Sequence, residues 1–138
     1  MKYLLLTILC LSIASNACEK AMDPSRITSA GGSVTEIIYF LNSQDSLVAV
    51  DVTSNFPPEA RDLPSIGYVR QLSAEGVLSL DPTIIIGEDD MGPPSVMEQI
   101  KRTNVEIKII PENHSIEGII EKVKCVSNII GKDSNELI

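Results

Sequence analysis

The sequence has 138 residues, of which 43% are hydrophobic and 22% are charged, so it has the size and composition of one globular domain. This composition excludes the disordered and fibrous classes. The 19 acidic residues outnumber the 11 basic ones and give a net charge of -8. A chain this acidic does not neutralise the phosphates of a nucleic acid over an extended face, so we expect no nucleic-acid partner.

Residues 1–17 have the pattern of a secretory signal peptide. Lys2 provides a positive start, residues 3–13 form an apolar run, and residues 15–17 (SNA) place small side chains before a cleavage point. The apolar run is well short of the ~20 residues that a membrane-spanning helix needs. We therefore predict an exported chain, in which residues 18–25 form an N-terminal linker.

Cys18 stands where a bacterial lipoprotein carries its lipid thioether, directly after this pattern. Lipoproteins usually have an aliphatic residue three positions earlier, and here that position is Ser15. Lipidation of Cys18 and an ordinary cut are thus alternatives. Cys18 and Cys125 are able to form one disulfide in an oxidising compartment, but we expect Cys18 to lie in a mobile stretch. Cys125 falls in an apolar helical pattern and is interpreted as a buried small hydrophobe.

Strand and helix signals alternate along the rest of the chain. Short apolar runs of strand length occupy residues 26–30, 47–52, 83–87 and 106–110. Helical spacing follows at residues 33–41, 73–80, 95–102 and 115–130, each segment opening on a serine suited to the N-cap, with a capping box expected at Ser33 and Glu36. Continuous apolar strands are typical of parallel sheets that are buried on both faces. The pattern predicts an α/β fold with a mainly parallel sheet flanked by helices.

Residues 53–72 form a long connection that contains three prolines and no clear period. Loops of this length inside a compact domain are usually functional. The loop holds Phe56, Tyr68 and Arg70, and it leaves the carboxyl end of a predicted strand, where open α/β sheets bind ligands. A second loop, residues 88–94, leaves the next strand. We interpret its carboxylates, Glu88, Asp89 and Asp90, as solvated rather than as a metal cluster.

Four stretches carry a resemblance to a known family. Residues 31–37 (GGSVTEI), 51–54 (DVTS), 56–58 (FPP) and 67–76 (GYVRQLSAEG) resemble the N-terminal lobe of the periplasmic haem-binding proteins of bacterial ABC haem importers. These belong to the wider class that binds iron-siderophores and vitamin B12. The stretch 67–76 is the part most specific to haem carriers. The resemblance implies a periplasmic protein with two α/β lobes linked by one long helix (class III), with the ligand held between them.

The resemblance implies ligand-binding roles for particular residues of the two loops. Tyr68 would bind ferric haem iron through its phenolate oxygen, a hard anionic ligand that favours Fe(III). A phenol loses its proton only well above neutral pH. We therefore expect Arg70, two residues further on an extended segment and facing the same way, to donate a hydrogen bond to the phenolate. Without the resemblance, Tyr68 is a loop aromatic and Arg70 a solvated charge. Phe56, Val69 and Met91 are predicted to contact the porphyrin.

The remaining expectations concern partners and chemistry. The resemblance implies that Glu75 forms a salt bridge with the ABC permease, although a glutamate in a first helical turn is also favoured by the helix dipole. His114 lies in a polar turn and is predicted to be a surface residue rather than an iron ligand. No hydrolase, zinc-protease, C-x-x-C zinc or phosphate-loop motif occurs, so we predict no enzyme activity.

The resemblance also implies a protein of about twice this length. We expect residues 26–138 to be the N-terminal periplasmic-binding lobe of a truncated chain, with the second lobe missing. The predicted function is haem binding and delivery to the permease, with membrane contact only through a lipid on Cys18. The alternatives are a siderophore or vitamin B12 carrier, a docking fragment that binds no ligand, and a small enzyme that uses the acidic loop.

Overall fold

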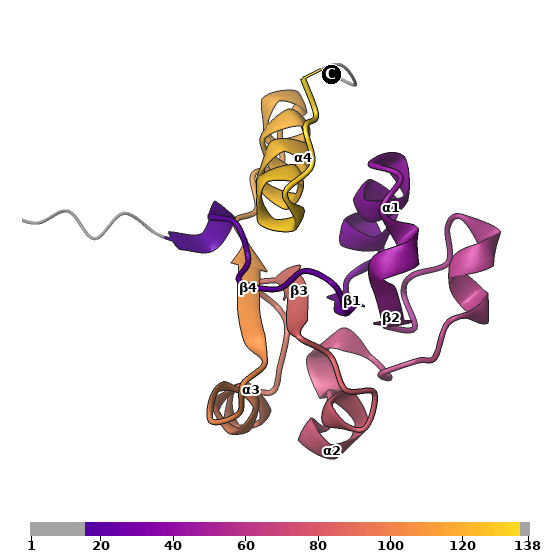
Figure 1. The fold of residues 1–138 in the computed structure, drawn as a ribbon, viewed down its shortest axis with the longest axis vertical. Helices are drawn as coiled ribbons and strands as arrows, with labels where there is room; N and C mark the ends of the chain where they lie inside the picture. Colours follow the sequence, from indigo (N-terminus) through magenta and orange to yellow (C-terminus); the bar gives the residue numbers. More distant parts are fainter. Residues whose placement is uncertain (1–15, 136–138) are drawn as a thin grey trace, which may run out of the picture.

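The computed structural model describes residues 16–135, and these residues alternate strands and helices as predicted (Figure 1). The predicted signal peptide lies almost wholly in residues 1–15, outside the described residues. No helix in residues 16–135 has the length and apolarity to cross a membrane. The elements are β1 (Ile27–Ala30), α1 (Gly32–Phe40), β2 (Leu47–Val50), α2 (Ala74–Leu78), β3 (Ile84–Glu88), α3 (Pro94–Lys101), β4 (Glu106–Ile110) and α4 (Ile116–Ile130).

The strands form one parallel sheet in the order β2-β1-β3-β4, which confirms the predicted fold class. β1 and β3 lie in the centre, and their side chains are buried because helices cover both faces. Since all strands run the same way, their carboxyl ends share one edge of the sheet. The loops that were predicted to hold the ligand begin at that edge.

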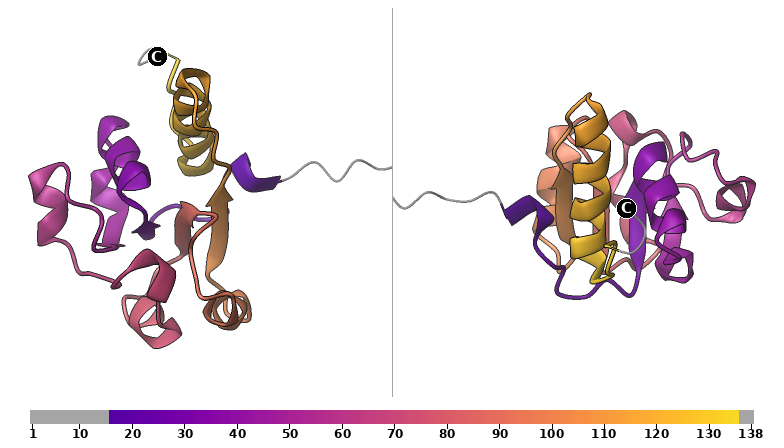
Figure 2. Two further views of the ribbon diagram at one scale, coloured as in Figure 1. Left: turned by 180° about the vertical axis from the view of Figure 1, so that it is seen from behind. Right: turned by 90° about the horizontal axis from the view of Figure 1, so that it is seen from above.

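The helices are divided between the two faces of the sheet. α1 and α4 cover one face, and α2 and α3 cover the other (Figures 1 and 2). Successive residues of a strand point to opposite faces. In β3, Ile84 and Ile86 therefore pack under α1 and α4, whereas Ile85 packs under α2 and α3. The sheet thus separates two apolar cores.

Two of the predicted helix caps are confirmed and two are wrong. Ser73 and Ser115 accept hydrogen bonds from backbone N–H groups three residues on, at 2.9 and 3.0 Å. Ser33 instead lies inside the first turn of α1, because the chain already turns at Gly31, whose φ of 134° suits glycine. α3 likewise begins at Pro94 rather than at Ser95, because the proline ring fixes the φ that a first helical turn needs.

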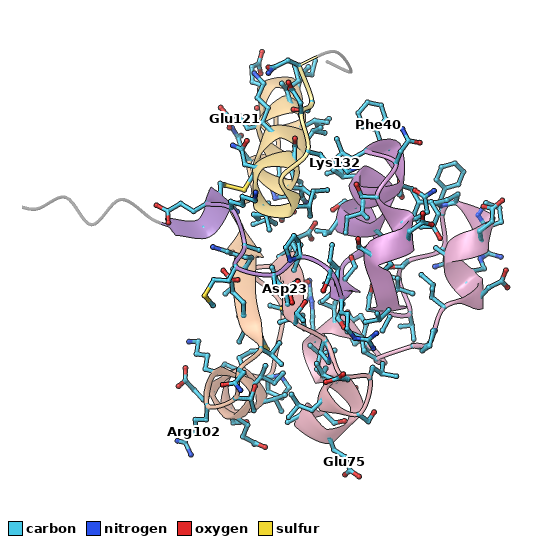
Figure 3. All side chains as sticks on the ribbon, viewed as in Figure 1. Asp23, Phe40, Glu75, Arg102, Glu121 and Lys132 are labelled. Carbon is cyan, nitrogen blue, oxygen red and sulfur yellow. A yellow bond between two sulfur atoms is a disulfide. The ribbon has the colours of Figure 1, made fainter. Side chains whose placement is uncertain are left out.

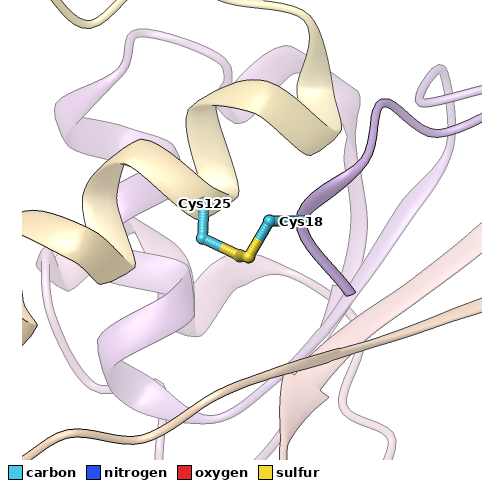
Figure 4. Close-up of a disulfide and its surroundings, with 2 residues drawn as sticks. All are labelled: Cys18 and Cys125. Carbon is cyan, nitrogen blue, oxygen red and sulfur yellow. A yellow bond between two sulfur atoms is a disulfide. The ribbon is translucent and has the colours of Figure 1, made fainter. Parts of the chain in front are cut away.

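The N-terminal stretch is fastened to the domain, contrary to the mobile linker predicted for residues 18–25. Cys18 forms a disulfide with Cys125 of α4, across 107 residues of sequence (Figure 4). Ala21 is buried, and its N–H donates to the carbonyl oxygen of Ile129 at 2.9 Å. The interpretation of Cys125 as a simple buried hydrophobe is corrected: its side chain is buried, but its sulfur is bonded to Cys18.

Candidate functional site

The candidate site lies at the carboxyl edge of the sheet, between β1 and β3. After β1 the chain crosses one face through α1 to reach β2, and after β3 it crosses the other face through α3 to reach β4. The connections that leave β1 and β3 therefore diverge. Open α/β sheets bind ligands at such a point, because the diverging loops leave a crevice there.

Asp51 fixes the start of the long loop. Its carboxylate is 1% exposed and accepts hydrogen bonds from the N–H of Gly31 at 3.0 Å, the hydroxyl of Thr53 at 2.7 Å and the hydroxyl of Ser54 at 2.9 Å. A buried carboxylate needs such donors in place of water. The carboxylate thus ties the loop to the turn before α1. Sequence reasoning missed this role, although an Asp directly after a strand, with Thr and Ser close behind, is a signal for it.

The far end of the long loop lies beside β2. Val50 donates to the carbonyl of Pro64 at 3.0 Å and accepts from the N–H of Ile66 at 2.9 Å, and Val52 donates to Gly67 at 2.9 Å. Residues 64–67 thus lie alongside the end of β2, where Ser65 forms a parallel bridge with Val50. The loop is held by backbone hydrogen bonds at the position where a ligand is expected.

These bonds decide which side chains of the loop face solvent. Ile66, Val69 and Leu72 are buried in the core under α2 and α3. Tyr68 lies between them in sequence and is 41% exposed, and Arg70 is also exposed. The extended segment predicted for these two residues is not found, because Val69–Gln71 form a short 3-10 helix that begins after Tyr68.

Burial corrects part of the predicted porphyrin contact. Val69 and Met91 are 5% and 6% exposed and pack within the core, so neither side chain offers a surface to a ligand. Val69 lies between the exposed Tyr68 and Arg70, and the sequence pattern did not separate buried from exposed positions. Phe56 is 62% exposed and remains available.

Arg70 joins the two predicted loops. Its Nε donates to Oδ2 of Asp90 at 2.8 Å. This ion pair replaces the predicted hydrogen bond to Tyr68, and it shows that Asp90 is paired rather than only solvated. The hydrogen bond to Asp90, and after it the electrostatic influence of Tyr68, raise the pKa of Arg70 above its ordinary value.

A second cluster of charged side chains lies at the end of β3. Lys122 of α4 forms ion pairs with Glu88, at the end of β3, and with Glu112. Ser33 of α1 also donates to Glu88, which brings both helices to the end of the strand. Glu88 is thus held by Lys122 and Ser33, so the predicted solvated role of Glu88 is corrected to a structural one. Within residues 16–135, no group of three or more metal-ligating side chains gathers.

A groove of about 970 Å³ opens beside this network, between α1 and α4. Its apolar wall includes Phe40, Phe56, Ile116 and Ile119, all of which are well exposed. His114 lines its rim with an exposed side chain, 3.7 Å from Glu112 through Nε2, as predicted for a surface residue. The groove extends the candidate site from Phe56 along the helices.

The two faces of the sheet carry different exposed features. Figure 3 shows Phe40 on α1 and Glu75 on α2, on opposite sides of the sheet. Glu75 is exposed in the first turn of α2 and points away from the domain. It therefore lies on the other face of the sheet from the groove between α1 and α4.

The fold and the open edge are those of a binding protein, and comparison with known proteins agrees. The family model for periplasmic binding proteins matches residues 27–135, so the chain belongs to this family. A crystal structure of a periplasmic haem-binding protein from Pseudomonas aeruginosa aligns with a TM-score of 0.74 and 40% identity, covering 78% of this chain and 38% of that one. The haem-binding protein HutB of Vibrio cholerae aligns with a TM-score of 0.73 and 38% identity, over 79% and 42% of the two chains.

Sequence comparison also finds carriers of another ligand. A vitamin B12-binding protein of Vibrio cholerae is 26% identical over 118 residues, covering 86% of this chain and 42% of its relative. The chain thus spans less than half the length of these relatives. It corresponds to one lobe of a class III periplasmic binding protein, as the sequence predicted.

Proposed function

We propose that this protein binds haem at the carboxyl edge of its sheet, with the phenolate of Tyr68 as axial ligand to ferric iron, and delivers it to an ABC importer in the periplasm. One observation carries the proposal: an exposed tyrosine stands beside a charged arginine at the edge where this fold binds ligands. The greater identity to the haem-binding structures supports it.

The surroundings of Tyr68 suit an anionic metal ligand. The buried neighbours Ile66 and Val69 hold the backbone on either side of the exposed Tyr68. Arg70 is exposed two residues further along the same loop. Asp90 binds only the Nε of Arg70, and the terminal nitrogens of a guanidinium carry further donors for the phenolate or a haem propionate.

The apolar contact would come from Phe56 and the adjoining groove. Phe56 is exposed at the junction between the loop and the groove, and a flat porphyrin gains free energy when aromatic surface covers its face. One lobe covers one face of such a ligand.

Vitamin B12 is the second candidate ligand, because the curated relatives with that function match most of this chain. A corrinoid brings its own cobalt ligands and does not need a phenolate. Binding of cobalamin that is unchanged when Tyr68 is replaced would favour this alternative.

Delivery requires a surface that a permease can recognise. Glu75 is exposed in the first turn of α2, so its carboxylate is open to a partner. We propose that Glu75 forms a salt bridge with basic residues of the permease.

The proposal is tested by titrating the exported chain with ferric hemin while recording absorption. We expect saturable binding with a tyrosinate-type high-spin spectrum in the natural protein, and loss of that spectrum in Tyr68→Phe. Tyr39→Phe is the matched control, because Tyr39 lies in α1 and packs against the core rather than at the edge. The same spectrum in Tyr68→Phe, or no binding by the natural chain, would contradict the assignment.

A further inference from the structure

The first described residues form a clasp, defined as residues 18–22, that joins two parts of the domain. Ala21 is 4% exposed and donates from its N–H to the carbonyl of Ile129 at 2.9 Å. Met22 donates from its N–H to Oε2 of Glu106 at 2.8 Å. The clasp therefore bonds to α4 and to β4 independently of its cysteine.

Cys18 is the covalent part of the clasp. Its sulfur is bonded to that of Cys125, which is 5% exposed in the middle of α4, and Cys18 packs against the core under α1 and α4 (Figure 4). The sulfur thus faces the protein interior. A sulfur bonded to its own Cβ and to a second sulfur has no bond left for a lipid thioether, so the disulfide and lipidation exclude each other.

We propose that Cys18 of the exported chain is a structural half-cystine and that the protein is not held to the membrane by a lipid at this residue. Three observations favour the disulfide over the lipid. Ser15 is a poor match to the aliphatic position before a lipidated cysteine, the clasp is bonded to the domain by its backbone, and its partner sulfur is buried beside it.

The chemistry balances in an oxidising compartment. The two thiols of Cys18 and Cys125 lose two protons and two electrons, and a protein or small-molecule disulfide accepts them and is reduced to two thiols. Such oxidants are available where exported proteins fold. The proposal does not depend on haem binding, since neither cysteine lies among the candidate ligand residues.

The test is the intact mass of the chain, expressed with its own leader in a Gram-negative host and extracted with detergent from whole cells. We expect a mass of unmodified residues 18–138 less two hydrogens, which gains those two hydrogens on reduction. We expect no thiol that reacts before reduction, and recovery in the aqueous phase of a Triton X-114 partition. A diacylglyceryl mass, partition into the detergent phase and one reactive thiol from Cys125 would overturn the proposal.

Two variants sharpen the result. Cys125→Ser removes the partner sulfur, so Cys18 becomes the one reactive thiol of the mature chain. Cys18→Ser removes both the disulfide and any lipid site, so its partition should match that of the natural protein. A shift of the protein from the detergent phase to the aqueous phase in Cys18→Ser would show that Cys18 had carried a lipid. The intact mass of the natural protein alone distinguishes the disulfide from the lipid. The test therefore holds even if a variant folds poorly.

Discussion

The long loop and the N-terminal clasp are both irregular segments, yet they are held in different ways. Residues 64–67 of the loop are held by backbone hydrogen bonds to the end of β2, and buried side chains alternate with exposed ones after them. The clasp has two backbone hydrogen bonds, one buried alanine and a covalent bond to α4.

The difference teaches how each segment serves the protein. Alternation in the loop leaves Tyr68 and Arg70 free for a ligand because their neighbours carry the packing. In the clasp, the buried Ala21 packs against the domain, and the sulfur of Cys18 is bonded to Cys125. Changes in the clasp should therefore alter stability and spare binding, whereas changes at the exposed loop positions should do the reverse.

The largest effect on stability is expected from breaking the disulfide. Cross-linking two cysteines 107 residues apart restricts the unfolded chain, so Cys125→Ser should lower the free energy of unfolding by about 2–5 kcal/mol. Urea unfolding followed by circular dichroism measures the change. Hemin affinity of the folded protein should stay the same. Equal stability of the variant and the natural chain would show that the backbone contacts hold the clasp without the disulfide.

A smaller loss is expected from the buried side of the loop. Val69→Ala removes apolar volume from the core and should cost about 1–3 kcal/mol of stability. The exposed side of the loop is tested by Phe56→Ala. This substitution changes an exposed side chain, so it should leave the unfolding midpoint unchanged while weakening hemin binding. Thermal unfolding and hemin titration of both variants separate the two roles. The comparison fails if Val69→Ala alters the spectrum of bound haem while leaving stability intact.

Arg70 should affect binding without affecting stability. The ion pair with Asp90 is exposed to solvent, and such pairs contribute little to folding. Arg70→Met should therefore keep the unfolding midpoint, but lower hemin affinity by about 10- to 100-fold, as loss of a group supporting a metal ligand does. Asp90→Asn is the control, since it removes the pair and keeps the cation. Equal loss of affinity in both variants would assign the effect to the ion pair instead.

The smallest effect concerns alkaline pH. Burial, and then the charges of Glu59 and Asp62, raise the pKa of Tyr39 above its ordinary value. The folded state then holds this proton more tightly than the unfolded state, so stability is fully present below the ordinary tyrosine pKa and falls as pH rises through the raised one. Tyr39→Phe should lose less stability over that alkaline range. Identical profiles from urea unfolding at several pH values would contradict this expectation.

The fold could be predicted from the sequence because its signals are local. Four apolar runs and four helical stretches appear at the expected places, and Glu106–Ile110 forms the strand that its composition indicated. The extended segment expected at Tyr68 and Arg70 is instead a short 3-10 helix over Val69–Gln71. The remaining errors depend on long-range contacts. The missed features each depend on residues that are distant in sequence. They are the burial of Met91, the pairing of Arg70 with Asp90 and the bond between Cys18 and Cys125.

The most direct test of the central claim is the resonance Raman spectrum of the ferric haem complex, excited in the phenolate-to-iron charge-transfer band. We predict phenolate vibrations in the natural protein and in Tyr39→Phe, and their absence in Tyr68→Phe. Those vibrations in Tyr68→Phe, or their absence from the natural complex, would contradict the assignment of Tyr68 as the iron ligand.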